Sequence, residues 1–190
     1  MSAKVALDVD WQPFYLNRNT PAEGEDLMEH LTAKYGPAAV ARFDAPDNPL
    51  DCAAGKVGIS FNKQRRIIRT GDSHRLVEWC KATQPQTVDP LMETLFKAYF
   101  EDARDLSRRE ELVACAAACG LDGEAAGKAL DSDAFQREVD AKATGWSRQG
   151  VRGVPFFVVH PASGNGEPVA FSGAQPSEVI AEVLAEQAAA

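Results

Sequence analysis

The chain has 190 residues, of which 45% are apolar and 25% charged, and its 28 Asp and Glu outnumber its 20 Lys and Arg, giving a formal charge of −8. This balance is typical of an ordinary globular protein and excludes disorder and collagen-like structure. The negative charge argues against a general nucleic-acid binder, which needs a basic face for phosphates. No run approaches the roughly 20 apolar residues of a membrane span, so no membrane association is predicted.

The N-terminal part predicts a strand followed by helices. Residues 5–11 alternate apolar and polar side chains, which is the period of a half-buried strand, and Pro13 then ends regular pairing. Apolar residues at helical spacing predict a helix over 27–35 that stops at Gly36 and Pro37. A second helix is expected from about Pro49 to Val57, leading into an extended segment at 59–61.

Residues 70–150 are almost wholly helical in pattern. Residues 107–110 (Ser-Arg-Arg-Glu) have the spacing of a capping box, and Gly120 is the matching C-terminal glycine. Asp122 and Ser132 are expected to cap the starts of the two following helices, and Gly150 ends the last one. This stretch therefore predicts an all-helical domain.

The last forty residues change character again. Residues 154–159 are β-branched and aromatic and predict a buried strand, a turn follows at 163–166, and 168–171 return as an antiparallel partner. A final helix is expected from about Pro176. The order of elements predicts an α/β fold with an inserted all-helical domain, divided into segments 1–69, 70–150 and 151–190.

The chain has four cysteines, Cys52, Cys80, Cys115 and Cys119. They are too few for a disulfide scaffold, and no two have the C-x-x-C spacing of a redox or zinc site. No metal site is predicted, because the three histidines are scattered without ligand spacing. The N-terminus is unlike a secretory signal, since Asp8 and Asp10 interrupt its apolar stretch. We therefore expect a cytoplasmic protein with free thiols.

Five local strings, in order along nearly the whole chain, resemble one family. They are Trp11-x-Pro13-Phe14-x-Leu16-Asn17 with Pro21 and Gly24, Ser73-His74-Arg75-Leu76, Leu95-Phe96-x-Ala98-Tyr99-Phe100, Gly150-Val151-x-Gly153-Val154-Pro155-Phe156-Phe157, and Ser172-Gly173-Ala174-Gln175. Together they are similar to the FrnE-type branch of the DsbA-like thioredoxin-fold oxidoreductases. That branch is related to the glutathione-dependent 2-hydroxychromene-2-carboxylate isomerases and kappa-class glutathione transferases.

The resemblance implies a thioredoxin-like fold with an inserted helical domain and thiol–disulfide exchange on a protein or peptide substrate. It implies that Val154-Pro155 is a cis-proline element, at which Val154 offers its N–H and C=O to an extended peptide. It also assigns substrate-binding roles to residues elsewhere, namely Trp11, Pro13, Phe14 and His74. No cofactor is implied, apart from glutathione as a redox partner.

One departure from the family concerns the start of the chain. The family normally begins with a strand and then a helix carrying the C-x-x-C, before the Trp-x-Pro-Phe string. Here Trp11 follows only ten residues, whereas a strand, a helix and their loops need roughly 20–30. We therefore expect the first β-α unit to be missing and a neighbouring strand to lack its partner. Either a second copy of the chain covers the gap, as a homo-oligomer, or the reading frame was started late.

Several residues have two interpretations. Cys115 and Cys119, at i and i+4 of one helix, are either an auxiliary redox pair or two small residues of a packed core. His74 is either a polar group near the cleft or a residue of a helical first turn. The basic run 63–69 either attracts an anionic peptide or glutathione, or forms a solvated loop.

Three functions remain open on the sequence. The first is a DsbA-like thiol–disulfide oxidoreductase, inactive by the family's route because no C-x-x-C is present. The second is a non-catalytic peptide-binding module that keeps the cis-proline groove. The third is a relative of the glutathione-dependent isomerases and transferases.

Overall fold

The computed structural model describes residues 5–190, which form two compact units. Residues 17–140 form one, here called the helical unit, and residues 5–16 with 141–190 form the other, here called the hairpin unit. The two units are defined by which residues pack together. The predicted segments 1–69, 70–150 and 151–190 were defined differently, by where a helical domain is inserted into the sequence, and they stay a prediction.

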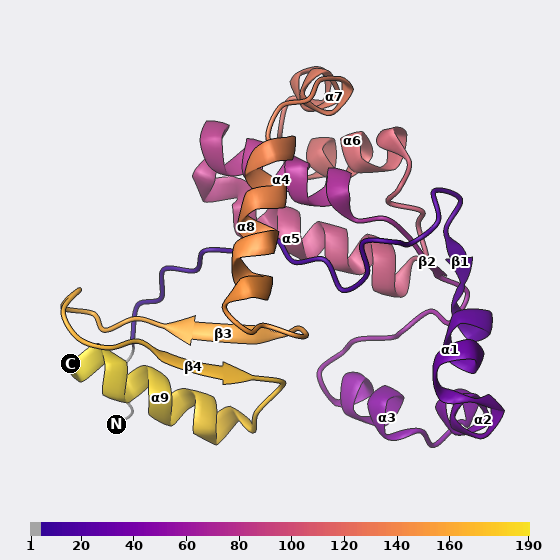
Figure 1. Cartoon of the computed structure of the whole chain (residues 1–190), viewed down its shortest axis with the longest axis horizontal. Helices are drawn as coiled ribbons and strands as arrows, with labels where there is room; N and C mark the ends of the chain where they lie inside the picture. Colours follow the sequence, from indigo (N-terminus) through magenta and orange to yellow (C-terminus); the bar gives the residue numbers. More distant parts are fainter. Residues whose placement is uncertain (1–4) are drawn as a thin grey trace. The chain divides into compact units, whose positions relative to one another are not determined.

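The first half of the helical unit contains three helices and a minimal sheet (Figure 1). Its elements are β1 (Glu25–Asp26), α1 (Leu27–Tyr35), α2 (Pro37–Asp44), α3 (Pro49–Lys56) and β2 (Arg66–Ile67). β1 and β2 pair antiparallel. The predicted helix over 27–35 and the one beginning at Pro49 are confirmed.

The predicted stop is also confirmed, because α1 ends at Tyr35 with Gly36 as its C-cap. Pro37 then opens α2, a helix that the sequence did not predict; a proline in the first turn of a helix loses no hydrogen bond that the helix needs. Residues 59–61 belong to no helix or strand, and the chain pairs only later, at β2. Gly24 explains the position of that pairing. It has a left-handed φ of 71°, and a Cβ at this residue would lie 2.7 Å from the carbonyl oxygen of Ile67.

The second half of the helical unit is a packed bundle. Its elements are α4 (Gly71–Thr83), the 3-10 turn η1 (Pro85–Thr87), α5 (Val88–Phe96), the π-helical turn η2 (Lys97–Glu101), α6 (Arg109–Ala118), α7 (Gly123–Asp131) and the start of α8 (Gln136–Arg148). α4 contacts α5, α6 and α7. The largest fully buried side chains are Leu76, Leu91, Leu112, Val139, Cys80 and Cys115.

The helix caps in this bundle follow the predictions in part. The Asp122 carboxylate caps α7 by accepting hydrogen bonds from the backbone amides of Glu124 and Ala125. Gly120, after the end of α6, has the left-handed φ of a C-terminal glycine, 81°. The capping box at 107–110 is wrong, because the Ser107 hydroxyl bonds to the carboxylate of Asp105 instead of an amide of α6. Ser132 is also not an N-cap: it lies at the C-cap of α7.

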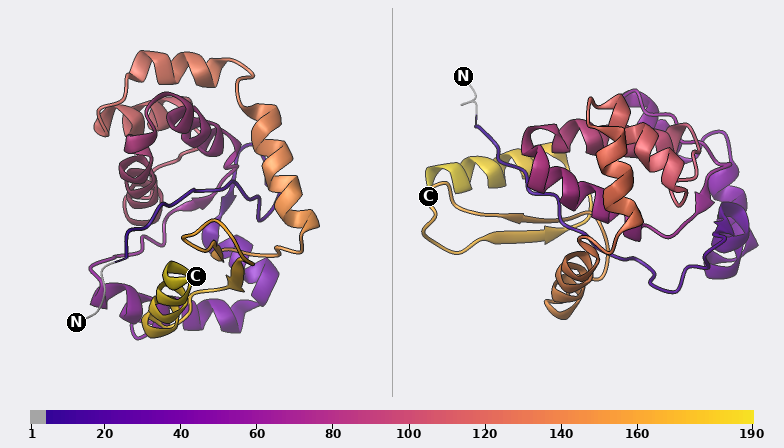
Figure 2. Two further views of the ribbon diagram at one scale, coloured as in Figure 1. Left: turned by 90° about the vertical axis from the view of Figure 1, so that its left-hand side faces the viewer. Right: turned by 90° about the horizontal axis from the view of Figure 1, so that it is seen from above.

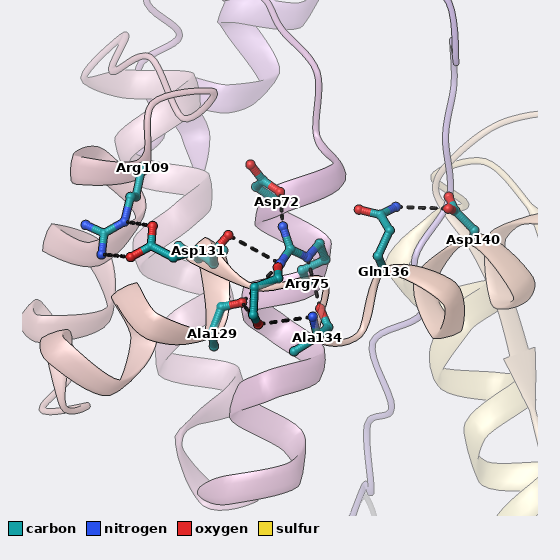
Figure 3. A network of polar contacts seen from close by, with 10 residues as sticks. Asp72, Arg75, Arg109, Ala129, Asp131, Ala134, Gln136 and Asp140 are labelled. Carbon is teal, nitrogen blue, oxygen red and sulfur yellow. Dashed lines mark hydrogen bonds and ion pairs between the residues drawn. The ribbon is translucent and has the colours of Figure 1, made fainter.

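Arg75 joins α4 to the end of α7 (Figure 3). Its side chain is only 7% exposed, yet its guanidinium is fully engaged. It donates 3.0 Å hydrogen bonds to the carbonyls of Ala129 and Ala134, a further bond to Ser132, and it pairs with Asp72 at 2.7 Å. A cation at a helix C-terminus satisfies carbonyls that have no partner within the helix.

The hairpin unit contains few regular elements. Its helix and strands are the remainder of α8, β3 (Phe156–Val159), β4 (Val169–Ser172) and α9 (Ser177–Ala189). The strand predicted over residues 5–11 is not formed, since this segment has no strand partner within residues 5–190. Alternating side chains indicate that a segment can be a strand, but a strand exists only where a neighbouring backbone bonds to it.

The predicted hairpin is confirmed, and so is the helix after Pro176. β3 pairs antiparallel with β4, Phe157 lies opposite Phe171, and their rings stack 5.0 Å apart. α9 contacts β3 and runs along the hairpin (Figures 1 and 2). The prediction that this strand is buried is wrong: Phe157 is 38% exposed, and the other three residues of β3 are only half-buried.

Candidate functional site

The Val154-Pro155 element stands immediately before β3. Its peptide bond is cis, and the Pro155 carbonyl accepts a 2.9 Å hydrogen bond from the Gly173 amide at the end of β4. The Val154 side chain is 54% exposed. The exposed Val154 thus lies just before the first strand of the β3–β4 hairpin.

The backbone groups of β3 point alternately toward β4 and away from it. Because Pro155 bonds to Gly173, the antiparallel pattern makes Phe157 and Val159 the residues that bond to β4. Phe156 and Val158 therefore direct their N–H and C=O groups to the opposite edge. Within residues 5–190 the structure shows no backbone hydrogen bond to either of them from that side. We call the outward groups of these two residues the open edge of β3.

The aromatic string near the N-terminus belongs to the same unit as Pro155. Pro13 is buried, and Trp11 and Phe14 are half-buried. The adjoining Gln12 accepts a 3.4 Å hydrogen bond from the indole N–H of Trp146 on α8. The structure therefore places five predicted site residues in the hairpin unit, namely Trp11, Pro13, Phe14, Val154 and Pro155.

His74 belongs to the helical unit, in the first turn of α4. Its amide bonds to the Thr70 carbonyl at 3.1 Å, and its Nε2 lies 3.4 Å from the Thr70 hydroxyl. This geometry is that of a residue completing a helical first turn. The substrate-binding role of His74 stays a prediction.

All four thiols are free and lie in the helical unit. Cys80 and Cys115 are fully buried, and Cys52 is exposed. Burial, with a smaller effect of Cys119, raises the pKa of the Cys80 thiol to about 11, and burial also raises the pKa of Cys115. Both thiols therefore have little of the thiolate form that attacks disulfides.

Cys115 and Cys119 lie in different surroundings. α6 ends at Ala118, so Cys119 is its C-cap residue; its sulfur lies 3.0 Å from the Thr94 hydroxyl and 3.4 Å from the Pro90 carbonyl. The proposed pairing of these two cysteines as an auxiliary redox site stays a prediction.

Several cations of the basic run 63–69 have partners within the protein, while Gln64, Arg66 and Arg69 are exposed. Both interpretations of this run stay predictions. Lys63 pairs with Asp51 at 3.1 Å and with Asp44 at 3.5 Å, and Arg69 donates to the carbonyl of the buried Thr20 at 2.7 Å. The guanidinium of Arg65 lies over the ring of Phe100. A polar hollow beside Lys63 is also lined by Glu101. The negative charge of Glu101 makes this hollow less attractive to an anionic ligand.

Sequence reasoning missed the open edge of β3 and the Arg75 contacts. Arg75 carries no signal in the sequence for its contacts with the end of α7, because those carbonyls lie more than fifty residues away along the chain. Within residues 5–190 no three His, Cys, Asp or Glu side chains are grouped to hold a metal ion. In the same range, no helix has the length and apolarity to span a membrane.

Comparison with known proteins places these features in a family. A model described as a DSBA-like thioredoxin domain matches residues 2–185. A probable DsbA oxidoreductase from Streptomyces coelicolor is 28% identical, with a TM-score of 0.78 over 92% of this chain and 72% of that one. A candidate protein disulfide isomerase from Nitrosomonas europaea shares the fold, at 17% identity and a TM-score of 0.64, over 80% of this chain and 72% of that one.

A search of curated proteins found no match. The family model nevertheless covers almost all of the sequence, and the predicted thioredoxin-like fold with its helical insertion agrees with both solved structures. The chain belongs to the family of DsbA-like thioredoxin domains.

Proposed function

We propose that this chain takes part in protein thiol–disulfide exchange, in which it binds an extended segment of the substrate beside Val154 and β3. The observation that carries this proposal is the exposed Val154 leading into an edge whose backbone groups are unpaired within the described residues. An extended segment can add to such an edge as a further strand through main-chain hydrogen bonds. Membership of the DsbA-like family supports the reaction class.

The residues of the hairpin unit include no cysteine. Cys80 and Cys115 are poor sources of the attacking thiolate, since burial raises the pKa of both thiols. As the source of this thiolate we propose a small thiol such as glutathione. Its thiolate attacks one sulfur of the bound substrate disulfide, a mixed disulfide forms, and the second substrate sulfur leaves as a thiolate. The five sequence strings favour the FrnE-type branch for this activity.

A second candidate is a peptide-binding module that performs no exchange. The specific observation in its favour is that all four cysteines lie in the helical unit, away in sequence from the Val154-Pro155 element. This candidate predicts the same peptide affinity but no acceleration of exchange.

Both candidates can be tested with a disulfide-bonded peptide and reduced glutathione. We expect the chain to accelerate reduction of the peptide, and Val154→Pro to lose at least tenfold of that effect, because the proline ring replaces an N–H donor. The matched control is Ala170→Pro, which places a proline on the outer side of β4. Equal loss in the control would mean that the hairpin itself was damaged.

Three further outcomes separate the candidates. Binding of the peptide without acceleration supports the non-catalytic module. Neither binding nor acceleration contradicts both. Loss of acceleration in a Cys115→Ser/Cys119→Ser double variant would show that the thiol belongs to this chain and that the external thiol is wrong.

A further inference from the structure

The segment that joins β3 to β4 contains Asn165 followed by Gly166. Both residues are exposed, and both lie outside the paired residues of the hairpin. The side-chain amide of an asparagine can be attacked by the backbone nitrogen of the next residue, and glycine hinders this attack least because it has no Cβ. The other four asparagines of the chain are followed by residues with side chains, namely Arg18, Thr20, Pro49 and Lys63.

Ser163 contacts both the backbone and the side chain of Asn165. Its hydroxyl donates a 3.0 Å hydrogen bond to the Asn165 carbonyl, and its own carbonyl accepts one of 3.4 Å from Nδ2 of Asn165. The Asn165 carbonyl belongs to the same peptide group as the N–H of Gly166, so that an anion formed on this nitrogen shares its charge with the carbonyl oxygen. A hydrogen bond donated to that oxygen stabilises the anion. The Ser163 hydroxyl is therefore placed to make the Gly166 nitrogen a better nucleophile.

The two sides of this connection differ in how they are held. The amide of Ala162 donates a 2.9 Å hydrogen bond to the carbonyl of Gln187 in α9, which anchors the residue before Ser163. Gly166 has a positive φ of 123°, and within residues 5–190 its N–H donates no hydrogen bond. The activating hydroxyl is thus held by its neighbour, while the attacking nitrogen gives up no bond when it turns toward the side chain.

We propose that Asn165 is a site of spontaneous deamidation, which Ser163 promotes and which converts the asparagine to aspartate and isoaspartate. Hydroxide from the solvent takes the proton of the Gly166 N–H, and this nitrogen forms a bond to Cγ of Asn165. The bond from Cγ to Nδ2 breaks, and ammonia leaves with a proton from water. Water then opens the cyclic imide at either carbonyl, giving aspartate from one and isoaspartate from the other. Nothing is oxidised or reduced.

The conversion goes beyond the proposed function and does not depend on it. It adds one negative charge to a chain whose formal charge is −8, since a carboxylate replaces a neutral amide. It also removes the Nδ2 donor that bonds to the Ser163 carbonyl. Because residue 165 lies outside the β3–β4 pairing, the hairpin itself should persist. The reaction is measured without peptide or thiol, so its failure leaves the exchange assay unaffected.

The test is incubation of the full chain at mildly alkaline pH, followed by mass spectrometry of its proteolytic peptides. We expect Asn165 to convert at least tenfold faster than Asn17, which is equally exposed but is followed by Arg18. Gly166→Ala should slow the conversion of Asn165 at least tenfold, because a Cβ crowds the attacking nitrogen. If Asn165 converts no faster than Asn17, or if Gly166→Ala converts as fast as the parent chain, the proposal is overturned.

The role of Ser163 is tested separately in the folded and the unfolded chain. Ser163→Ala should slow the conversion at least threefold in the folded chain, and Ser163→Thr, which keeps the hydroxyl, should retain most of the parent rate. In concentrated urea the hydrogen bond to the Asn165 carbonyl is lost, so the parent chain and Ser163→Ala should react equally fast. Equal rates in the folded chain, or a difference that persists in urea, would contradict the role of the folded Ser163 contacts.

Discussion

Leu112 in α6 and Phe157 in β3 are both large apolar side chains on regular elements, but Leu112 is fully buried and Phe157 is 38% exposed. The same contrast holds for the two units as wholes. Nearly all of the buried apolar residues lie in the helical unit, whereas those of the hairpin unit are Ala143 and Val151, with Pro13 and Pro161. The helical unit has a large core of its own, and the hairpin unit buries few apolar side chains.

Polar groups show the same difference. In the helical unit the carbonyls at the end of α7 are satisfied by the buried Arg75, and the cations of the run 63–69 are engaged by carboxylates, carbonyls and rings. In the hairpin unit the outward backbone groups of β3 have no such partner within the described residues. An extended peptide can bind to such an edge through main-chain hydrogen bonds.

The largest effect should come from truncating the core. Leu112→Ala is expected to lower the free energy of unfolding by about 2–5 kcal/mol, because it removes buried methyl groups and leaves a cavity. Val179→Ala, whose side chain is 43% exposed, should change it by about 0.5 kcal/mol or less. Urea unfolding followed by circular dichroism measures both. Similar costs would mean that α9 is as tightly packed as α6.

A smaller loss is expected from Arg75→Ala. The substitution leaves the carbonyls at the end of α7 without donors, which should cost about 2–3 kcal/mol of unfolding free energy. Arg109→Ala is the control, because this arginine and its ion-pair partner Asp131 are both exposed, so the substitution should matter much less (Figure 3). If the control costs as much as Arg75→Ala, then the buried contacts are not the reason for the stability.

The smallest effect concerns pH. The pKa of Cys80 is raised to about 11 in the folded protein, above its ordinary value of 9.0. The folded state therefore keeps a proton that the unfolded state loses, so stability falls as the pH rises from about 9 toward 11. Urea unfolding between pH 8 and 10.5 should show this decline, and Cys80→Ala should reduce it. Cys52→Ala, at an exposed thiol, should leave the decline unchanged.

Much of the fold could be predicted because its causes are local. Asp122 and Gly120 act through amides and φ angles within a few residues, and the hairpin is signalled by its turn and by two apolar runs. The end of α1 at Gly36 was predicted, but α2 was not, because a proline that follows one helix can also open the next and the neighbouring residues did not indicate this. The capping box at Ser107 was predicted wrongly, because the Ser107 hydroxyl donates its hydrogen bond to the Asp105 carboxylate.

The candidate site was only partly predictable. The Val154-Pro155 element could be found from its string, but Arg75 could not, because its contacts depend on where α7 ends in space. The sequence placed Cys115 and Cys119 four residues apart on one helix, but it did not show that the helix ends between them or what surrounds each thiol. Cys115 is enclosed by neighbouring helices, while Cys119 lies at the helix end beside Thr94.

The sequence by itself determined the family, the C-terminal hairpin and the helix that follows it, because turn chemistry, periodicity and strings of neighbouring residues are local properties. Only the tertiary structure decided which apolar segments are covered. Residues 5–11 and 154–159 both have strand-forming patterns, yet one finds no strand partner within the described residues and the other finds a partner on one side. The burial and pairing of a strand depend on which distant segments of the chain pack beside it, and a local sequence pattern does not contain that information.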